Sequence, residues 1–518
     1  MKQKTCDFSK KYIKWIVLSI ATIYFLFSCF FIYFYKYNVW TIAIISLLLI
    51  IFEFALLILF GIKVNSLYSI FLLLFNIFYF GVPLAIFFSS SFDTNYYLYW
   101  LSFSHSTQAT NSSLSAAYVL SIIFSYLYTS VGCIIFAFRA PLLEATKPRS
   151  LINKILLNRN ERIDNAVLLA FIVIFIFSLV PYFWTQISAV QTFIKHGYSS
   201  VYTNESVPGI IQTISPFFNI SLLFCCIYFY LCQNQKSKIF YIVISIFILI
   251  ELLEMIKGTR LKQVIYLIVV LILLSKRMIT KKQKYIFAIS LFFGLLFGST
   301  VLTYISYARS TVGISLNSFL GFIFSNSLGT VFARTLTEYG NTIKSLFLAI
   351  EYYPSYHNYF YGFTYLCSFA SVYPNTFNIY GDFVNFYSFV KFLPKSTQYS
   401  LGGSVVGEAY ANFGFFGSII FAHILPIILL SISIFFDLSV DKKNRNFIFI
   451  SLFLYRFALE WIRGYFVTFI FPLFAILLAV FVCWLILKKK TPVFLKKIMQ
   501  YAAPIEESKE NQYYEVII

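Results

Sequence analysis

Residues 401–436 read LGGSVVGEAYANFGFFGSIIFAHILPIILLSISIFF, a glycine-rich segment that runs directly into an apolar one. A helix needs about 20 mostly apolar residues to cross a bilayer. The run from 413 to 436 is long enough, so we predict that a membrane span starts at 413. We apply the same criterion of apolar length to the rest of the chain to predict the fold class.

The chain as a whole has the composition of a membrane protein. Hydrophobic residues fill 60% of its 518 positions and charged residues only 12%, which is far from the balance of a soluble domain. The class predicted is an all-α polytopic membrane protein with about 12 transmembrane helices. They are expected at 13–35, 39–60, 66–88, 116–138, 165–184, 209–231, 239–256, 261–275, 285–306, 413–436, 447–462 and 465–487.

Lysine and arginine predict the orientation, because positive residues are retained on the cytoplasmic side. They concentrate in alternate loops when the N-terminus is placed inside. The net charge of +20 then reflects topology and attraction to anionic inner-leaflet lipid, and it gives no reason to expect nucleic acid as a partner. The predicted parts are a transmembrane bundle at 1–306, a long, partly helical extracytoplasmic loop at 307–412, three further spans at 413–487 and a cytoplasmic basic tail at 488–518.

The predicted outer loop is too long to be a mere connector. It contains EYYPSYHNYFYGFTY (351–365), which is rich in tyrosine. Such rings either anchor at the membrane–water interface or stack on sugars, whose hydroxyls find partners in Tyr and Asn. Both interpretations can hold in one loop.

Common cofactor and metal motifs are missing from the sequence. It has no Walker loop, no GxGxxG entering a helix, no Asp-x-Asp and no Cys/His cluster. We therefore expect no cofactor and no metal, and any group transfer is expected to be metal-independent.

Charged residues within the spans are informative, because each costs about 2.5–3.5 kcal/mol at the bilayer centre. LYRFALEWIRGYF (454–466) carries Arg456, Glu460 and Arg463 on one helix face. They form either an internal ion-pair network or, because one glutamate leaves one arginine unneutralised, a positive pocket for an anion such as phosphate.

Further basic residues lie near the outer ends of neighbouring spans. They are Lys257 and Arg260 in KGTR, Arg309 in SYARSTVG, and Arg334 beside Glu338 in FARTLTEYG. Capping of a helix C-terminus and interfacial snorkelling would explain the first two. Anion binding would explain the whole group.

Glu408 is the only carboxylate in the glycine-rich stretch and lies just before the predicted span at 413. The helix dipole alone favours a carboxylate there, and the nearby glycines can form a packing face. Alternatively, Glu408 is a general base and the glycines let a substrate approach closely. Competing bases are Glu338, His357, Asp382 and His423.

Together, KGTR (257–260), the long outer loop, GGSVVGEAYANFGFFG (402–417) and the arginine-bearing helix after it resemble the O-antigen or oligosaccharide-repeat-unit polymerases of the Wzy type. The hydropathy layout matches along the whole chain, and the motifs match in its second half. The resemblance implies a glycosyltransferase of the bacterial cytoplasmic membrane, with one undecaprenyl-diphosphate-linked glycan transferred to a hydroxyl of another on the outer face.

The leaving group in such a reaction is the lipid diphosphate, so charge stabilisation is the larger demand. The predicted diphosphate-binding residues are Arg260, Lys257, Arg309, Arg334, Arg456 and Arg463, supported by Glu460 and Glu338, with Glu408 as the candidate base. The partners implied are an undecaprenyl-diphosphate-linked oligosaccharide and membrane lipid, with a chain-length regulator and a flippase as further candidates.

Two other functions stay open. A lipid-linked oligosaccharide flippase or exporter would also bind diphosphate, but it should line a path through both leaflets with charge. Glu53, deep in the second span, is the main observation in its favour. An O-antigen ligase would differ in its acceptor.

Overall fold

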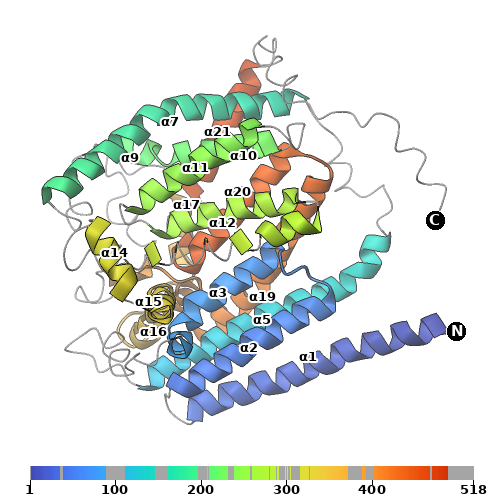
Figure 1. Cartoon of the computed structure of the whole chain (residues 1–518). Coiled ribbons are helices and arrows are strands. Elements are labelled where there is room, and N and C mark those ends of the chain that lie inside the picture. Colours follow the sequence, from blue (N-terminus) through green and yellow to red (C-terminus); the bar gives the residue numbers. More distant parts are fainter. Residues whose placement is uncertain are drawn as a thin grey trace. The chain divides into compact units, whose positions relative to one another are not determined.

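The computed structural model describes most of the chain, and every regular element in its described residues is a helix (Figure 1). The described residues are 2–34, 39–88, 111–145, 161–196, 207, 209–230, 238–256, 260–278, 280–287, 289–290, 294, 298, 300–301, 304, 316–325, 327–370, 388–392, 402–466 and 470–487. The predicted all-α class is confirmed for this part of the chain.

The chain forms two compact units. Unit 1 comprises residues 1–150, 288–435 and 453–471, and unit 2 comprises 151–287, 436–452 and 472–518. The helices of unit 1 are α1 (Lys2–Phe34), α2 (Val39–Phe60), α3 (Leu67–Leu84), η1 (Ala85–Phe87), α5 (Asn111–Ala145), α14 (Leu316–Ser325), α15 (Leu328–Gly340), α16 (Thr342–Tyr352), α17 (Phe363–Ala370) and η3 (Phe389–Phe392). Those of unit 2 are α7 (Glu161–His196), α9 (Gly209–Ile214), α10 (Phe217–Tyr230), α11 (Lys238–Ile256) and α12 (Arg260–Arg277).

Three helices near the C-terminus contribute residues to both units. They are α19 (Val405–Asp441), α20 (Arg445–Ile462) and α21 (Ile470–Ile486).

Within the described residues, 7 helices are long and apolar enough to cross a membrane. They are Ile13–Phe34, Val39–Phe60, Leu67–Phe87, Ser112–Phe138, Arg162–Thr192, Gly209–Tyr230 and Val405–Asp441, and each coincides with a predicted span. The protein is therefore a multi-pass membrane protein. The full number of about 12 spans and the outer location of 307–412 stay predictions.

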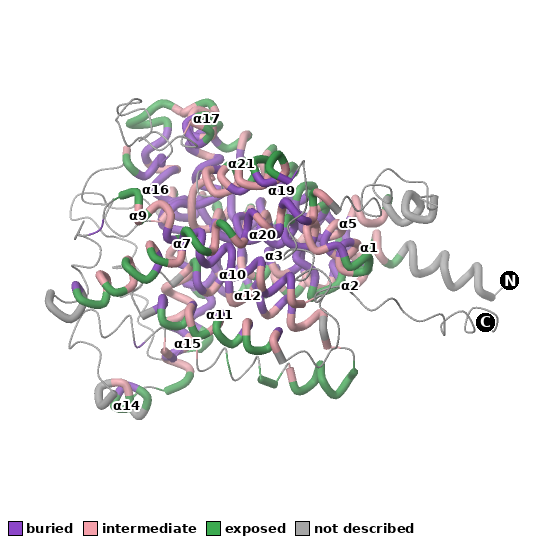
Figure 2. Tube along the Cα trace, turned by 90° about the horizontal axis from the view of Figure 1, so that it is seen from above, coloured by how far each residue is buried: buried purple, intermediate pink, exposed green. Residues whose placement is uncertain are grey.

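Unit 1 is built on a bundle in which α1, α2 and α5 lie side by side (Figure 1) and α3 packs against α2 and α5. Helix α3 begins where the Ser66 hydroxyl accepts a hydrogen bond from Ser69 N (3.2 Å), which satisfies one of the open amides of its first turn. Figure 2 shows α3 buried along most of its length, and Phe75 stacks on Phe124 of α5 with ring centroids 4.9 Å apart.

Glu53 has a structural explanation inside this bundle. Its fully buried carboxylate accepts a hydrogen bond from Asn76 Nδ2 (2.8 Å), and Asn76 Oδ1 accepts one from Ser125 Oγ (2.9 Å). Three helices thus share one polar contact in their core, where a polar group without partners would be costly. Glu53, the residue that favoured a flippase, has no exposed surface in this structure.

Helix α15 belongs to the segment predicted as an outer loop, yet it packs closely beside the last turns of α3. The two helices approach at Gly81 and Gly340. A Cβ atom on Gly81 would lie 2.5 Å from the carbonyl oxygen of Leu336, and one on Gly340 would collide with Val82 N. The position of α15, which carries Arg334 and Glu338, is therefore fixed by backbone contact with a spanning helix.

Unit 2 also has a buried carboxylate at its centre. Glu254 of α11 accepts hydrogen bonds from three amide side chains on three other helices: Gln186 Nε2 of α7 (3.0 Å), Asn219 Nδ2 of α10 (3.0 Å) and Gln263 Nε2 of α12 (2.7 Å). These bonds satisfy the carboxylate away from water and hold the four helices in register.

Helix α16 contains a buried lysine that makes the stability of unit 1 depend on pH. Burial lowers the pKa of Lys344 to about 8, whereas an unfolded lysine has a pKa of about 10.4. Between these values the unfolded state binds more protons, so the free energy of unfolding rises with pH.

We expect Lys344→Met to remove this dependence. In detergent, the melting temperature of the wild type should rise between pH 8 and pH 10 relative to that of the variant, and both should run parallel below pH 7. Lys442→Met, which changes an exposed lysine, should follow the wild type throughout. Parallel curves for the wild type and Lys344→Met over the whole range would contradict the prediction.

Candidate functional site

The glycine-rich stretch forms the start of α19, which begins eight residues earlier than the hydropathy predicted, at Val405 instead of 413. The hydroxyl of Ser404 accepts a hydrogen bond from Gly407 N (2.9 Å), as the N-cap of a helix does, and lies 2.7 Å from Tyr79 OH of α3. Glu408 therefore lies in the first turn of the helix and not ahead of it, which corrects the predicted boundary.

Glu408 is fully buried, and both of its carboxylate oxygens accept hydrogen bonds. Oε2 accepts from Trp461 Nε1 (2.7 Å) and from Phe466 N (3.1 Å), and Oε1 accepts from Thr364 Oγ1 (3.3 Å). The donors come from the end of α20, from the segment just after it and from α17. One carboxylate of α19 thus connects this helix to α17 and to the end of α20, which are far apart in the sequence.

Helix α19 is interrupted at Gly414, whose φ of 68° is a conformation that favours glycine. The carbonyl oxygens of Ala411 and Asn412 accept hydrogen bonds from Phe360 N (3.0 Å) and Tyr361 N (2.8 Å), where a regular helix would use amides four residues further on. The tyrosine-rich segment therefore docks on the backbone that the kink releases.

The Asn412 side chain connects the kink to Glu408. Its Nδ2 donates to Thr364 Oγ1 (2.6 Å) and to the Glu408 carbonyl oxygen (2.7 Å), and its Oδ1 accepts from Gly362 N (3.1 Å). Burial raises the pKa of the neighbouring Tyr365 phenol well above its usual value, and the charge of Glu408 raises it further. The phenol is therefore protonated at neutral pH.

Two of the predicted arginines converge on one helix. Arg463, which follows the end of α20 and is partly exposed, donates from Nη1 to the carbonyl oxygen of Glu338 on α15 (3.2 Å). Arg334 is exposed and lies one helical turn before Glu338. Arg463 thus contacts the helix that carries Arg334 and Glu338, and we call these three residues of unit 1 the arginine site.

The other predicted pair is an internal ion pair. Arg456 and Glu460 are both buried, and Arg456 Nη2 lies 2.5 Å from Glu460 Oε1. The Arg456 guanidinium also lies over the Phe457 ring, 4.8 Å from its centroid. The internal ion pair that the sequence allowed is therefore present, and diphosphate binding by Arg456 stays a prediction.

The remaining predicted residues are not among the contacts that define the arginine site in the described residues. Arg260 is the first residue of α12 in unit 2, while Lys257, Arg309 and Asp382 lie outside the described residues. His357 is exposed after α16, and His423 is exposed on α19 with Nδ1 2.8 Å from the carbonyl oxygen of Ile419. No group of three or more His, Cys, Asp or Glu side chains that could hold a metal occurs in the described ranges.

The sequence did not indicate the donors that hold Glu408. Trp461 and Thr364 lie 53 and 44 residues from it. One signal was present for Trp461, because a buried indole N–H needs an acceptor and Glu408 is a carboxylate at a membrane helix. A hydroxyl such as that of Thr364 gives no comparable signal.

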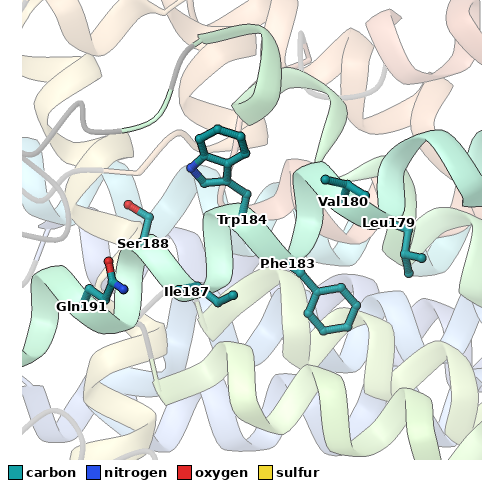
Figure 3. Close-up of a pocket in the computed structure, with 7 residues that line it drawn as sticks. All are labelled: Leu179, Val180, Phe183, Trp184, Ile187, Ser188 and Gln191. Atoms are coloured by element: carbon teal, nitrogen blue, oxygen red, sulfur yellow. The ribbon is translucent and has the colours of Figure 1, made fainter.

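A surface hollow on α7 of unit 2 is a poor candidate for a site. Its volume is about 640 Å³, and its lining residues are Leu179, Val180, Phe183, Trp184, Ile187, Ser188 and Gln191. Figure 3 shows these side chains spread along one stretch of α7. An exposed apolar face of one spanning helix, without converging polar groups, is what contact with lipid tails requires.

Close backbone packing at Gly403 gives a test of the site. A Cβ atom there would overlap the carbonyl oxygen of Gly464, next to Arg463, so we expect Gly403→Ala to destabilise unit 1 by about 1–3 kcal/mol. Gly321→Ala is the matched control, because a Cβ there meets nothing within 4 Å. Melting in detergent should separate the two variants, and equal melting temperatures would contradict the packing described.

The chain matches the model of a known protein family. The profile described as O-antigen polysaccharide polymerase Wzy matches residues 16–496. No curated protein and no solved structure matched the chain. Because the family match covers almost the whole chain, the protein belongs to the Wzy family of O-antigen polysaccharide polymerases.

Proposed function

We propose that this polymerase joins two undecaprenyl-diphosphate-linked glycans on the outer face of the bacterial cytoplasmic membrane. A hydroxyl of the incoming repeat unit attacks the anomeric carbon of the growing chain. The bond from that carbon to the diphosphate oxygen breaks, a glycosidic bond forms, and undecaprenyl diphosphate leaves as an anion. The hydroxyl proton passes to a base.

The arginine site carries this proposal. Arg463 lies against α15 one turn from the exposed Arg334. Guanidinium groups bind phosphate oxygens through paired hydrogen bonds, so the two arginines can stabilise the charge that develops on the leaving diphosphate. Such stabilisation is the main requirement when the leaving group is already good, and it needs no metal.

Glu338 is a base that the geometry supports. Its side chain is partly exposed on α15, one turn after Arg334, and its backbone carbonyl oxygen accepts the hydrogen bond from Arg463. A general base must lie within hydrogen-bond reach of the proton it takes, which requires an exposed side chain near the reacting groups. The predicted role of Glu408 as the base has no such support from its fully buried position.

The tyrosine-rich segment supports binding of the acceptor sugar. The Tyr356 and Tyr361 side chains are 72% and 76% exposed, and the kink of α19 holds the backbone of Tyr361. Exposed aromatic rings with hydroxyl groups suit a pyranose, which has an apolar face and polar edges. In this proposal the acceptor repeat unit lies on these rings.

A reconstitution experiment tests the proposed function. Purified protein in vesicles would receive a synthetic undecaprenyl-diphosphate repeat unit with a chelator present. We expect a glycan ladder from the wild type, and a loss of about 10²-fold in rate for Arg463→Ala. Arg463→Lys should lose less, because lysine keeps the charge but not the paired donors. Lys442→Ala, which removes an exposed charge elsewhere, should match the wild type.

Three results would contradict the proposal. Labelled lipid that crosses the vesicle membrane without ladder formation would indicate a flippase. Transfer of one glycan to a different, non-diphosphate acceptor would indicate a ligase. A ladder that disappears with the chelator would show that the reaction depends on a metal.

A further inference from the structure

The two oxygens of the Glu408 carboxylate hold different parts of unit 1. Oε1 accepts from Thr364 of α17, while Oε2 accepts from Trp461 Nε1 at 2.7 Å and from Phe466 N at 3.1 Å. Arg463 lies between the two Oε2 donors in the sequence. The carboxylate therefore holds both ends of the short turn, residues 461–466, that presents this arginine.

This turn has weak support from its own backbone. Helix α20 ends at Ile462, and the next two amides, Arg463 N and Gly464 N, make long hydrogen bonds of 3.3 Å each to carbonyls three residues earlier. On the other side, the backbone at Gly403 packs against Gly464. The hydrogen bonds to Glu408 are shorter, and they reach both ends of the turn.

We propose that Glu408 is a positioning residue for diphosphate binding. Its carboxylate fixes the 461–466 turn, and the turn holds the Arg463 guanidinium against α15 at the arginine site. This inference rests on the proposed function, because it takes the ligand of Arg463 to be the lipid diphosphate. Glu408 itself touches no substrate, because its side chain is fully buried and both of its oxygens are occupied.

Glu408→Gln separates positioning from base catalysis. The amide oxygen of glutamine has two lone pairs and can accept from both Trp461 and Phe466, while its NH₂ group can donate to the Thr364 hydroxyl. Hydrogen bonds to all three partners can thus remain, with the one to Thr364 reversed in direction, and the basicity is lost. A positioning residue tolerates this change, whereas a general base does not.

The first measurement is the rate of ladder formation against lipid-donor concentration. We expect Glu408→Gln to keep kcat/KM within about threefold of the wild type, because its hydrogen bonds persist. Trp461→Phe removes one of the two hydrogen-bond donors on the Arg463 side of the carboxylate. KM for the lipid-linked substrate should therefore rise about tenfold, with a smaller change in kcat. Thr364→Val removes one donor on the other side, and its effect on KM should be clearly smaller.

The second measurement is binding without turnover. The full chain in detergent would be titrated calorimetrically with undecaprenyl diphosphate. We expect the wild type and Glu408→Gln to bind alike, and Trp461→Phe and Arg463→Ala to bind more weakly. Thermal melting would show that each variant is folded. Glu408→Ala is not used here, because it leaves the buried hydrogen-bond donors of Glu408 without an acceptor.

The results that overturn the inference differ from those that overturn the function. If Glu408→Gln binds diphosphate normally but loses about 10²-fold in kcat or more, Glu408 is the base and not a positioning residue. If Trp461→Phe binds like the wild type while Arg463→Ala binds weakly, the positioning role is wrong and the diphosphate site stands. If Arg463→Ala also binds like the wild type, the proposed diphosphate site itself is wrong.

Discussion

The buried carboxylate of Glu408 is the interaction on which this part of the molecule depends. A carboxylate away from water must receive hydrogen bonds, because a polar group without them costs several kcal/mol. The three donors that it receives come from α17, from α20 and from the segment that follows α20. If one of these segments moved away, the carboxylate or a hydrogen-bond donor would lose its partner. The Glu408 side chain therefore holds all three segments in place.

The proposed chemistry follows from what those backbones carry. The turn held by Glu408 bears Arg463, and α15, which Arg463 contacts, is fixed by its close approach to α3. The segment held by Asn412 and the kink at Gly414 bears the exposed tyrosine Tyr361. The arginine that we propose binds the diphosphate and the aromatic surface that we propose binds the sugar are thus both anchored to the first turns of α19. Preorganised charge is what a reaction with an anionic leaving group requires.

The sequence predicted those features of the fold and site that depend on residues close together in the chain. Apolar length predicted the spans that the described helices confirm, and the i, i+4 spacing allowed the pairing of Arg456 with Glu460. The start of α19 was misplaced, because hydropathy falls in the glycine-rich stretch although Ser404 caps the helix there. Trp461 and Thr364 as partners of Glu408, and Asn76 as the partner of Glu53, depend on the register between helices. A single sequence carries no record of that register.

Hydrogen–deuterium exchange shows whether Glu408 holds the 461–466 turn, because Phe466 N–H is itself bonded to the carboxylate. Mass spectrometry of peptides that cover this turn would compare the wild type, Glu408→Gln and Glu408→Ala in detergent. We expect faster exchange in the turn for Glu408→Ala, wild-type exchange for Glu408→Gln, and unchanged exchange in α2 for both variants. Equal protection of the turn in all three proteins would show that Glu408 does not hold the arginine in place.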